Sequence, residues 1–203
     1  MDILNTIQKI IENDSNPVIL LEGKRNVLDN DKDKLIKIGK RLAEKFPSVI
    51  FRSGNADGSD NLFIQGVASV PNSKIELVVP YQGHKKQNIP ETAKVINLNE
   101  LDFECDTQFV MLTKNLLSKR SADAIDKYIL NNKITTQSTT KAAYLLRDTI
   151  KVTGYNDVNK ACLGLFYDDL KNPESGGTGY TMLTCRTLKI PYFKQDVYFE
   201  LLK

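Results

Sequence analysis

The sequence predicts an α/β fold in which helices cover both faces of a doubly wound, mainly parallel β-sheet. Two observations carry this prediction. Short apolar runs alternate along the chain with amphipathic helical patterns, as in β–α–β crossovers, and glycine-rich segments follow two of the apolar runs. At 203 residues, the chain is long enough for one complete hydrophobic core and short for two. We therefore expect a single domain over residues 1–203, with a helical embellishment at about 103–154.

The first half of the chain contains regular strand and helix signals. Apolar residues at helical spacing predict a helix over 3–11, and the wholly apolar run after Pro17 predicts a strand over 18–21 that is buried on both faces. Candidate caps at Asn30 and Asp31 precede the strongest helical pattern of the chain. The further elements expected in this half are a helix over 32–46, a strand over 49–52, a helix over 60–68, and strands over 75–79 and 94–98.

The second half begins with helical patterns and then returns to the alternation. Helices are expected over 115–130 and 141–152, separated by the polar, threonine-rich connector 133–140. The elements expected after them are a strand over 161–167, a helix over 180–188, a strand over 190–193 and a terminal helix from residue 196.

Three loops follow predicted strands and therefore belong at one edge of the sheet, where the carboxyl ends of parallel strands meet. Their glycines either permit tight turns or allow a phosphate to approach backbone N–H groups, and their hydroxyl and guanidinium groups add donors. Because three such loops share an edge, the pattern favours a ligand site. The candidate ligand-binding residues are Gly23, Lys24 and Arg25 in the first loop; Ser53, Gly54, Asn55, Gly58, Ser59 and Asp60 in the second; and Gly176, Gly177, Thr178 and Gly179 in the third.

Several other polar residues have two interpretations. Asp60 is expected to cap its own helix, with ribose or water binding as the alternative. His84 is expected to be an exposed loop residue rather than an acid or base. Asp168 and Asp169 are interpreted as turn residues, because no third ligand is spaced to complete a metal site. Arg147, within a helical pattern, is expected to form an ion pair or meet solvent rather than contact a ligand.

Composition sets modest limits on function. Lys plus Arg number 28 against 25 for Asp plus Glu, and a net charge of +3 leaves nucleic acid open without favouring it. The cysteines, Cys105, Cys162 and Cys185, are odd in number and lack CxxC spacing, which is typical of reduced thiols in the cytosol. No stretch approaches the roughly 20 apolar residues of a membrane span. We therefore expect a cytoplasmic protein without membrane contact, metal or other cofactor.

The loops together match a family pattern. The turn at 23–25, the Ser-Gly-x-Ala-x-Gly-x-Asp form at 53–60, the strand ending at 78–80 and the late glycine run at 176–179 resemble the Rossmann-like superfamily that joins DNA processing protein A with the Lonely Guy phosphoribohydrolases. The resemblance covers roughly residues 17–193. It implies a doubly wound sheet whose glycine loops hold a nucleotide or its phosphate, and it implies a homodimer.

The resemblance leaves three functions open. The first is binding of a nucleotide or nucleotide-derived ligand by a sensor or accessory protein. The second is an N-glycosidase, although Tyr180 and Leu183 stand where the hydrolases carry the Thr and the catalytic Glu of their loop, so that Asp60 or Glu174 would have to supply the carboxylate.

The third function is that of a DNA-processing accessory protein which binds single-stranded DNA through its backbone. The contacts would come from Lys24, Arg25, Lys85 and Lys86. The chain lacks a strong basic stripe, so nucleotide binding is the preferred prediction.

Overall fold

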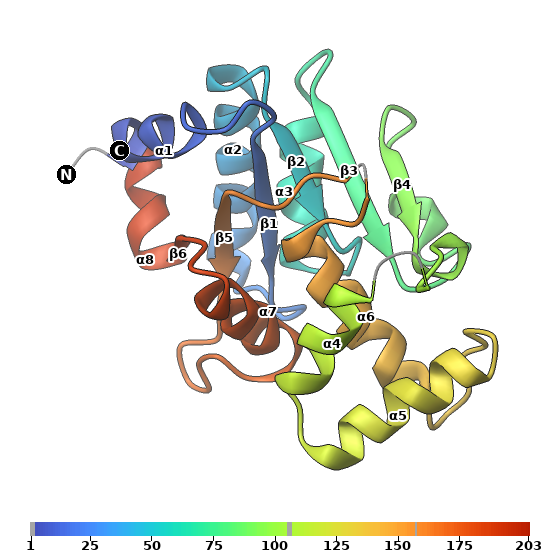
Figure 1. Ribbon diagram of the computed structural model, residues 1–203. Coiled ribbons are helices and arrows are strands. Elements are labelled where there is room, and N and C mark those ends of the chain that lie inside the picture. Colours follow the sequence, from blue (N-terminus) through green and yellow to red (C-terminus); the bar gives the residue numbers. More distant parts are fainter. Residues whose placement is uncertain (1–2, 105–106, 157) are drawn as a thin grey trace.

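The computed structural model describes residues 3–104, 107–156 and 158–203 (Figure 1). Within these residues six strands form one all-parallel sheet in the order β4-β3-β2-β1-β5-β6. The predicted Rossmann-like α/β fold is therefore confirmed. The strands are β1 (Val18–Gly23), β2 (Ile50–Ser53), β3 (Lys74–Val79), β4 (Lys94–Asn97), β5 (Leu163–Tyr167) and β6 (Tyr192–Lys194).

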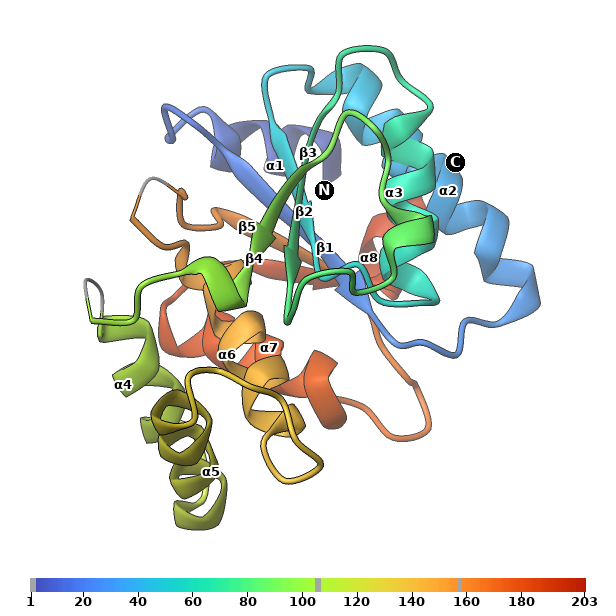
Figure 2. The same ribbon diagram turned by 90° about the vertical axis from the view of Figure 1, so that its right-hand side faces the viewer.

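Helices cover both faces of this sheet, as Figure 2 shows from the side. The first face carries α1 (Ile3–Ile11), α2 (Asp29–Lys45), α3 (Ser59–Ala68) and α8 (Gln195–Tyr198). The second face carries α4 (Gln108–Asn115), α5 (Lys119–Leu130), α6 (Thr140–Thr153) and α7 (Gly176–Thr187). Short 3-10 turns lie at Lys86–Asn88, Leu98–Glu100 and Phe199–Leu202.

Strand β1 is buried on both faces because it lies in the middle of the sheet. Side chains alternate along a strand, so Ile19 and Leu21 join the core under α1, α2 and α3, whereas Val18 and Leu20 join the core under α7. No helix in the described part of the chain is long and apolar enough to cross a bilayer.

After β1 and after β5 the chain turns toward opposite faces of the sheet, and this divergence positions the site. After β1 it passes to α2 on the first face, and after β5 it passes to α7 on the second face. The two strands are hydrogen-bonded neighbours, with Gly23 paired to Tyr167 at their carboxyl ends. Such a switch point leaves a crevice between the diverging loops, where ligands of open α/β sheets bind.

Some element boundaries differ from those expected. Helix α7 begins at Gly176 rather than at residue 180, so the glycine run forms its first turn. The helix expected over 115–130 begins at Lys119 as α5, and α4, which the sequence did not predict, precedes it. Helix α2 begins at Asp29 without a side-chain cap, so Asn30 and Asp31 lie in its first turn.

Candidate functional site

A cavity of about 710 Å³ lies at the switch point. Its walls come from the end of β1, the loops that follow β1, β2 and β5, the first turn of α7, and α6 with the segment before it. This volume suits a small-molecule ligand. Of the predicted site residues, those that line the cavity are Gly23, Lys24, Arg25, Asp60, Gly176, Gly177 and Thr178. Those that do not are Ser53, Gly54, Asn55, Gly58, Ser59 and Gly179.

The carboxylate of Asp60 joins the first two loops. Its Oδ1 accepts the N–H of Gly23 at 3.1 Å, and its Oδ2 accepts the N–H of Gly54 at 3.2 Å. The N-cap position of α3 is occupied by Gly58, and no side chain caps that helix. The expected capping role of Asp60 is therefore wrong, because its two oxygens are used to hold the loops after β1 and β2 together.

Close backbone packing explains the glycines of the second loop. Gly58 has a φ of +84°, and a Cβ there would lie 2.1 Å from the carbonyl oxygen of Arg25. A Cβ at Gly54 would lie 1.6 Å from a guanidinium nitrogen of Arg147. Ser59 donates its hydroxyl to the carbonyl of Lys24 at 2.9 Å. These residues support the first loop and the Arg147 side chain from behind the cavity lining.

The amino end of α7 opens onto the cavity. Ser175 occupies the N-cap position, yet its side chain makes no capping hydrogen bond. A Cβ at Gly176 would meet no atom within 4 Å, and one at Gly177 would meet only an oxygen of Asp148, at 3.3 Å. The first N–H groups of a helix have no partner within the helix and carry its positive dipole end. The first turn of α7 therefore presents backbone donors in open space.

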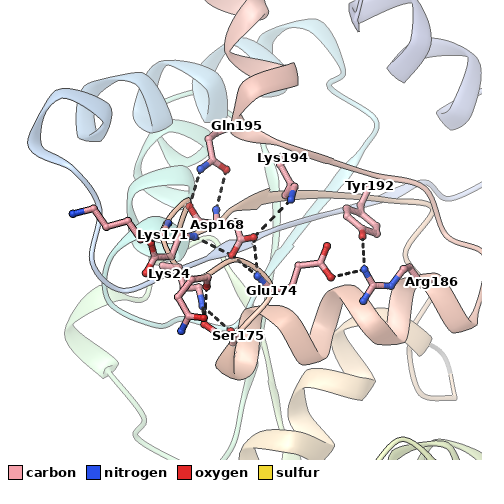
Figure 3. Close-up of polar contacts among 11 residues, drawn as sticks. Lys24, Asp168, Lys171, Glu174, Ser175, Arg186, Tyr192, Lys194 and Gln195 are labelled. Atoms are coloured by element: carbon pink, nitrogen blue, oxygen red, sulfur yellow. Dashed lines mark hydrogen bonds and ion pairs between the residues drawn. The ribbon is translucent and has the colours of Figure 1, made fainter.

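The loop before α7 is held by the side chain of Asp168 (Figure 3). Its carboxylate accepts the N–H of Asp169 at 2.9 Å and the N–H of Glu174 at 3.0 Å. Gln195 exchanges two hydrogen bonds with the Asp168 backbone, accepting from its N–H and donating to its carbonyl. Asp168 is thus a turn residue, as expected, and it fixes where α7 begins.

Lys24 connects this loop to the end of β1 (Figure 3). Its Nζ donates to the carbonyl oxygen of Ser175 at 2.6 Å and to the Ser175 hydroxyl at 2.7 Å. Arg25, next in the chain, is exposed, and its side chain makes no ion pair or hydrogen bond with the residues that the structure describes. The two neighbouring cations therefore differ, since Lys24 positions the amino end of α7 whereas Arg25 is available at the cavity.

Glu174 lies outside the cavity. Its carboxylate pairs with Arg186 of α7 at 2.5 Å, and Arg186 also donates to the hydroxyl of Tyr192 (Figure 3). Because Glu174 is directed away from the cavity lining and Asp60 is held by two backbone N–H groups, neither of the carboxylates suggested for a glycosidase is placed as a free acid or base.

A charged cluster that was not predicted from the sequence lies at the inner wall of the cavity, with Glu22, Arg147 and Asp148 in the lining and Lys151 buried behind them. Glu22 of β1 meets Lys151 of α6 through its Oε2 and accepts the hydroxyl of Thr181 at 3.0 Å through its Oε1. Lys151 Nζ also lies 2.9 Å from Asp148 Oδ1. Burial raises the pKa of Glu22 to about 7, against the opposing effect of Lys151.

Arg147 belongs to this cluster. Its side chain is 5% exposed, lines the cavity and donates a hydrogen bond to the carbonyl of Gly54 at 3.1 Å. The expected ion pair is present, because Arg147 Nε lies 3.2 Å from a carboxylate oxygen of Asp148. The alternative expectation, that Arg147 meets solvent, is wrong. The cluster could have been inferred from the sequence, because charged residues stand at positions 147, 148 and 151 of a mainly apolar helical pattern. Spacings of three and four place such residues on one helix face.

His84 is buried, which corrects the expectation of an exposed loop residue. Its ring packs edge-on against Tyr81 and Tyr144, with ring centroids 5.1 and 5.9 Å apart. Burial and the nearby cation of Arg147 lower the pKa of His84 to about 4. The imidazole is therefore neutral at pH 7, and it fixes the half-buried ring of Tyr144, which lines the cavity.

The two cysteines that the structure describes do not line the cavity. Cys162 is partly buried and Cys185 is buried, and both are free thiols. Burial raises the pKa of Cys185 to about 12. The prediction for Cys105 falls outside the described residues.

Comparison with solved structures places this fold among known proteins. The structure superposes on DNA processing protein A from Helicobacter pylori with a TM-score of 0.50 and 15% sequence identity, covering 92% of this chain and 67% of that one. The two folds are alike. The description of that protein reports a single-stranded DNA binding mode. At this identity the likeness extends to the fold alone, so the resemblance to the Lonely Guy enzymes stays a prediction.

Sequence comparisons do not assign the chain to a family. No family model matches the chain, and the search of curated proteins gives no significant match. The functional argument therefore rests on the geometry of the cavity.

Proposed function

We propose that the cavity binds a nucleotide or nucleotide-derived ligand by its phosphate, and that the whole chain acts as one binding domain in a sensor or accessory protein. The observation that carries this proposal is the amino end of α7, where Gly176 and Gly177 leave the first helical turn open to the cavity. A helix amino end with accessible N–H groups is a suitable anion site.

Cationic side chains at the cavity support the same assignment. Arg25 is available for a bidentate contact with phosphate, and Lys141, an exposed residue of α6, also lines the cavity. Lys24 holds Ser175 and thereby keeps the first turn of α7 in place. The anion site is thus both charged and positioned before a ligand arrives, which lowers the entropic cost of binding.

The size and lining of the cavity favour a ligand larger than phosphate. A volume of about 710 Å³ far exceeds one phosphate group, and the ring of Tyr144 offers an aromatic surface next to the polar walls. The engagement of Asp60 and Glu174 by other protein groups supports binding rather than the glycosidase reaction that these two carboxylates would carry.

A thermal-shift screen tests the proposal. Ribonucleoside 5′-monophosphates, nucleotide sugars and inorganic phosphate are compared, because a ligand at about 100 times its dissociation constant adds about 2.7 kcal/mol to folding stability. We expect at least one nucleotide to raise the melting temperature more than phosphate does. No shift with any nucleotide would contradict the proposal.

The variant Gly177→Val ties this shift to the amino end of α7. Its side chain would project toward Asp148, whose Oδ2 lies 3.3 Å from a Cβ at this position, so we expect the ligand-induced shift to disappear while the protein still melts cooperatively. Ala68→Val, an exposed change in α3 outside the cavity, is the control for adding a β-branched residue to a helix.

Two results would favour the alternative functions instead. Release of free base from a nucleoside monophosphate by wild-type protein would establish a glycosidase. Affinity for a single-stranded oligonucleotide that exceeds that for every mononucleotide, and that falls steeply with salt, would establish a nucleic-acid site.

A further inference from the structure

Asp148 is a cavity carboxylate with unused acceptor capacity. It lies on α6, is 4% exposed and lines the cavity. Lys151 Nζ and Arg147 Nε lie 2.9 and 3.2 Å from its Oδ1, which balances its charge. Both cations are therefore on the Oδ1 side of the carboxylate, whereas no group in the described part of the chain donates a hydrogen bond to Oδ2. A carboxylate oxygen can accept about two hydrogen bonds, so Oδ2 has acceptor capacity for a ligand.

The other two carboxylates at this wall are already occupied. Asp60 accepts two backbone N–H groups. Glu22 accepts the hydroxyl of Thr181 with one oxygen and contacts Lys151 with the other. Asp169 also lines the cavity, but it is exposed to solvent and its Oδ1 accepts the N–H of Lys171. Asp148 is therefore the buried carboxylate of the cavity lining that is left to meet a ligand.

The position of Asp148 limits what that ligand group is. A Cβ built at Gly177 would lie 3.3 Å from Asp148 Oδ2, so the carboxylate is beside the amino end of α7. A group bound by both must carry a hydrogen-bond donor within a few ångströms of the phosphate. An unprotonated phosphate oxygen offers this carboxylate no donor, whereas a sugar hydroxyl is a neutral donor.

We propose that Asp148 accepts a hydrogen bond from a hydroxyl of the sugar that carries the bound phosphate, so that the cavity selects a phosphorylated ribose over its deoxygenated counterpart. This inference rests on the proposed function. It moves the ribose-binding role that the sequence suggested for Asp60 to a residue 88 positions later, on the helix that covers the opposite face.

Isothermal titration with paired probes tests the inference. The four ribonucleoside 5′-monophosphates are compared with their 2′,3′-dideoxy counterparts, which keep the base and the phosphate. Removing the partner of a charged acceptor costs about 10- to 100-fold in affinity. We expect the wild-type protein to prefer the ribo form by that factor for each base that binds.

The variant Asp148→Asn removes the charge and keeps the shape of the side chain. We expect the ribo-to-dideoxy preference to fall at least about fivefold, because a neutral acceptor makes a weaker hydrogen bond than a carboxylate does. Glu174→Gln, which neutralises a carboxylate outside the cavity, is the matched control and should keep the wild-type preference.

The outcomes separate the two proposals. If wild-type protein binds no nucleotide of either kind, the proposed function fails. If it binds both kinds equally, the sugar contact is overturned while phosphate binding stands. If the preference exists but survives unchanged in folded Asp148→Asn protein, Asp148 is not the acceptor. Should that variant not fold, the wild-type comparison of ribo and dideoxy probes still decides whether a sugar hydroxyl is recognised.

Discussion

The Nζ atom of Lys24 lies 2.6 Å from the carbonyl oxygen and 2.7 Å from the hydroxyl oxygen of Ser175. These residues are 151 positions apart in the chain, and their contact joins the end of β1 to the residue before α7. A lysine next to a glycine turn resembles a phosphate ligand when only the sequence is considered. In the structure its charge is used to hold the amino end of the helix that we propose binds the phosphate.

The variant Lys24→Met tests this positioning role. Loss of two hydrogen bonds from a charged, partly exposed donor should lower the free energy of unfolding by about 1 to 2 kcal/mol, which urea denaturation measures. Ligand affinity should also fall, because the first turn of α7 loses its support. Normal stability with reduced affinity would instead make Lys24 a direct ligand contact.

Arg25→Ala should show the opposite combination. Its side chain has no ion-pair partner within the described residues, so stability should change by less than about 0.5 kcal/mol. Nucleotide affinity should fall by about 1.5 to 3 kcal/mol, the scale of a hydrogen bond to a charged group. Arg41→Ala, on the exposed side of α2, controls for the loss of one positive charge. Loss of stability without loss of affinity would make Arg25 structural.

Substitutions of Gly177 and Gly179 in α7 should differ in their effect on the stability of the fold. A Cβ at Gly179 would lie 1.8 Å from the carbonyl oxygen of Glu174, so Gly179→Ala must displace the loop before the helix. We expect it to destabilise the fold by about 1 to 3 kcal/mol, seen in thermal melts. Gly177→Ala, whose added carbon meets one side-chain oxygen at 3.3 Å, should melt near wild type. Equal melting of the two variants would contradict this account.

The stability of the protein should depend on pH through Glu22. Burial raises its pKa from 4.5 to about 7, so between these values the folded protein holds a proton that the unfolded chain releases. The contribution of Glu22 to the free energy of unfolding therefore falls as pH rises from 4.5 to 7. Glu22→Gln should remove this contribution, so that urea midpoints measured at half-unit steps rise more with pH in the variant than in the wild-type protein. An unchanged profile would show that Glu22 does not contribute it.

His84 should have the opposite effect. Burial, with the nearby cation of Arg147, lowers its pKa from 6.5 to about 4, so the unfolded chain binds a proton that the folded protein lacks. Stability from His84 therefore rises with pH over this range. The wild-type profile should be flattened where the two effects overlap, and His84→Phe should reveal the falling profile of Glu22. A rising profile in His84→Phe would show that the sign assigned to Glu22 is wrong.

Local patterns were sufficient for the fold and for part of the site. Strand β1 was predictable because Val18 to Leu21 are all apolar, which fits a strand buried on both faces. The loops at 23–25 and 176–179 were recognisable from glycine after a strand, and both contribute residues to the cavity. The sequence predicted a start of helix α7 at residue 180 rather than at Gly176, because glycine has a low helix propensity. The packing of Gly179 against Glu174 decides where the helix begins.

The sequence by itself determined the alternation of strands and helices, and hence that glycine loops gather at one edge of the sheet. Only the tertiary structure decided which polar side chains face the cavity. Lys24 and Asp60 are engaged by residues of other loops, whereas Arg25 and Asp148 face the cavity. The physical reason is that hydrophobic periodicity is local, while the partner of a buried charge comes from wherever the fold brings a complementary group within about 3 Å.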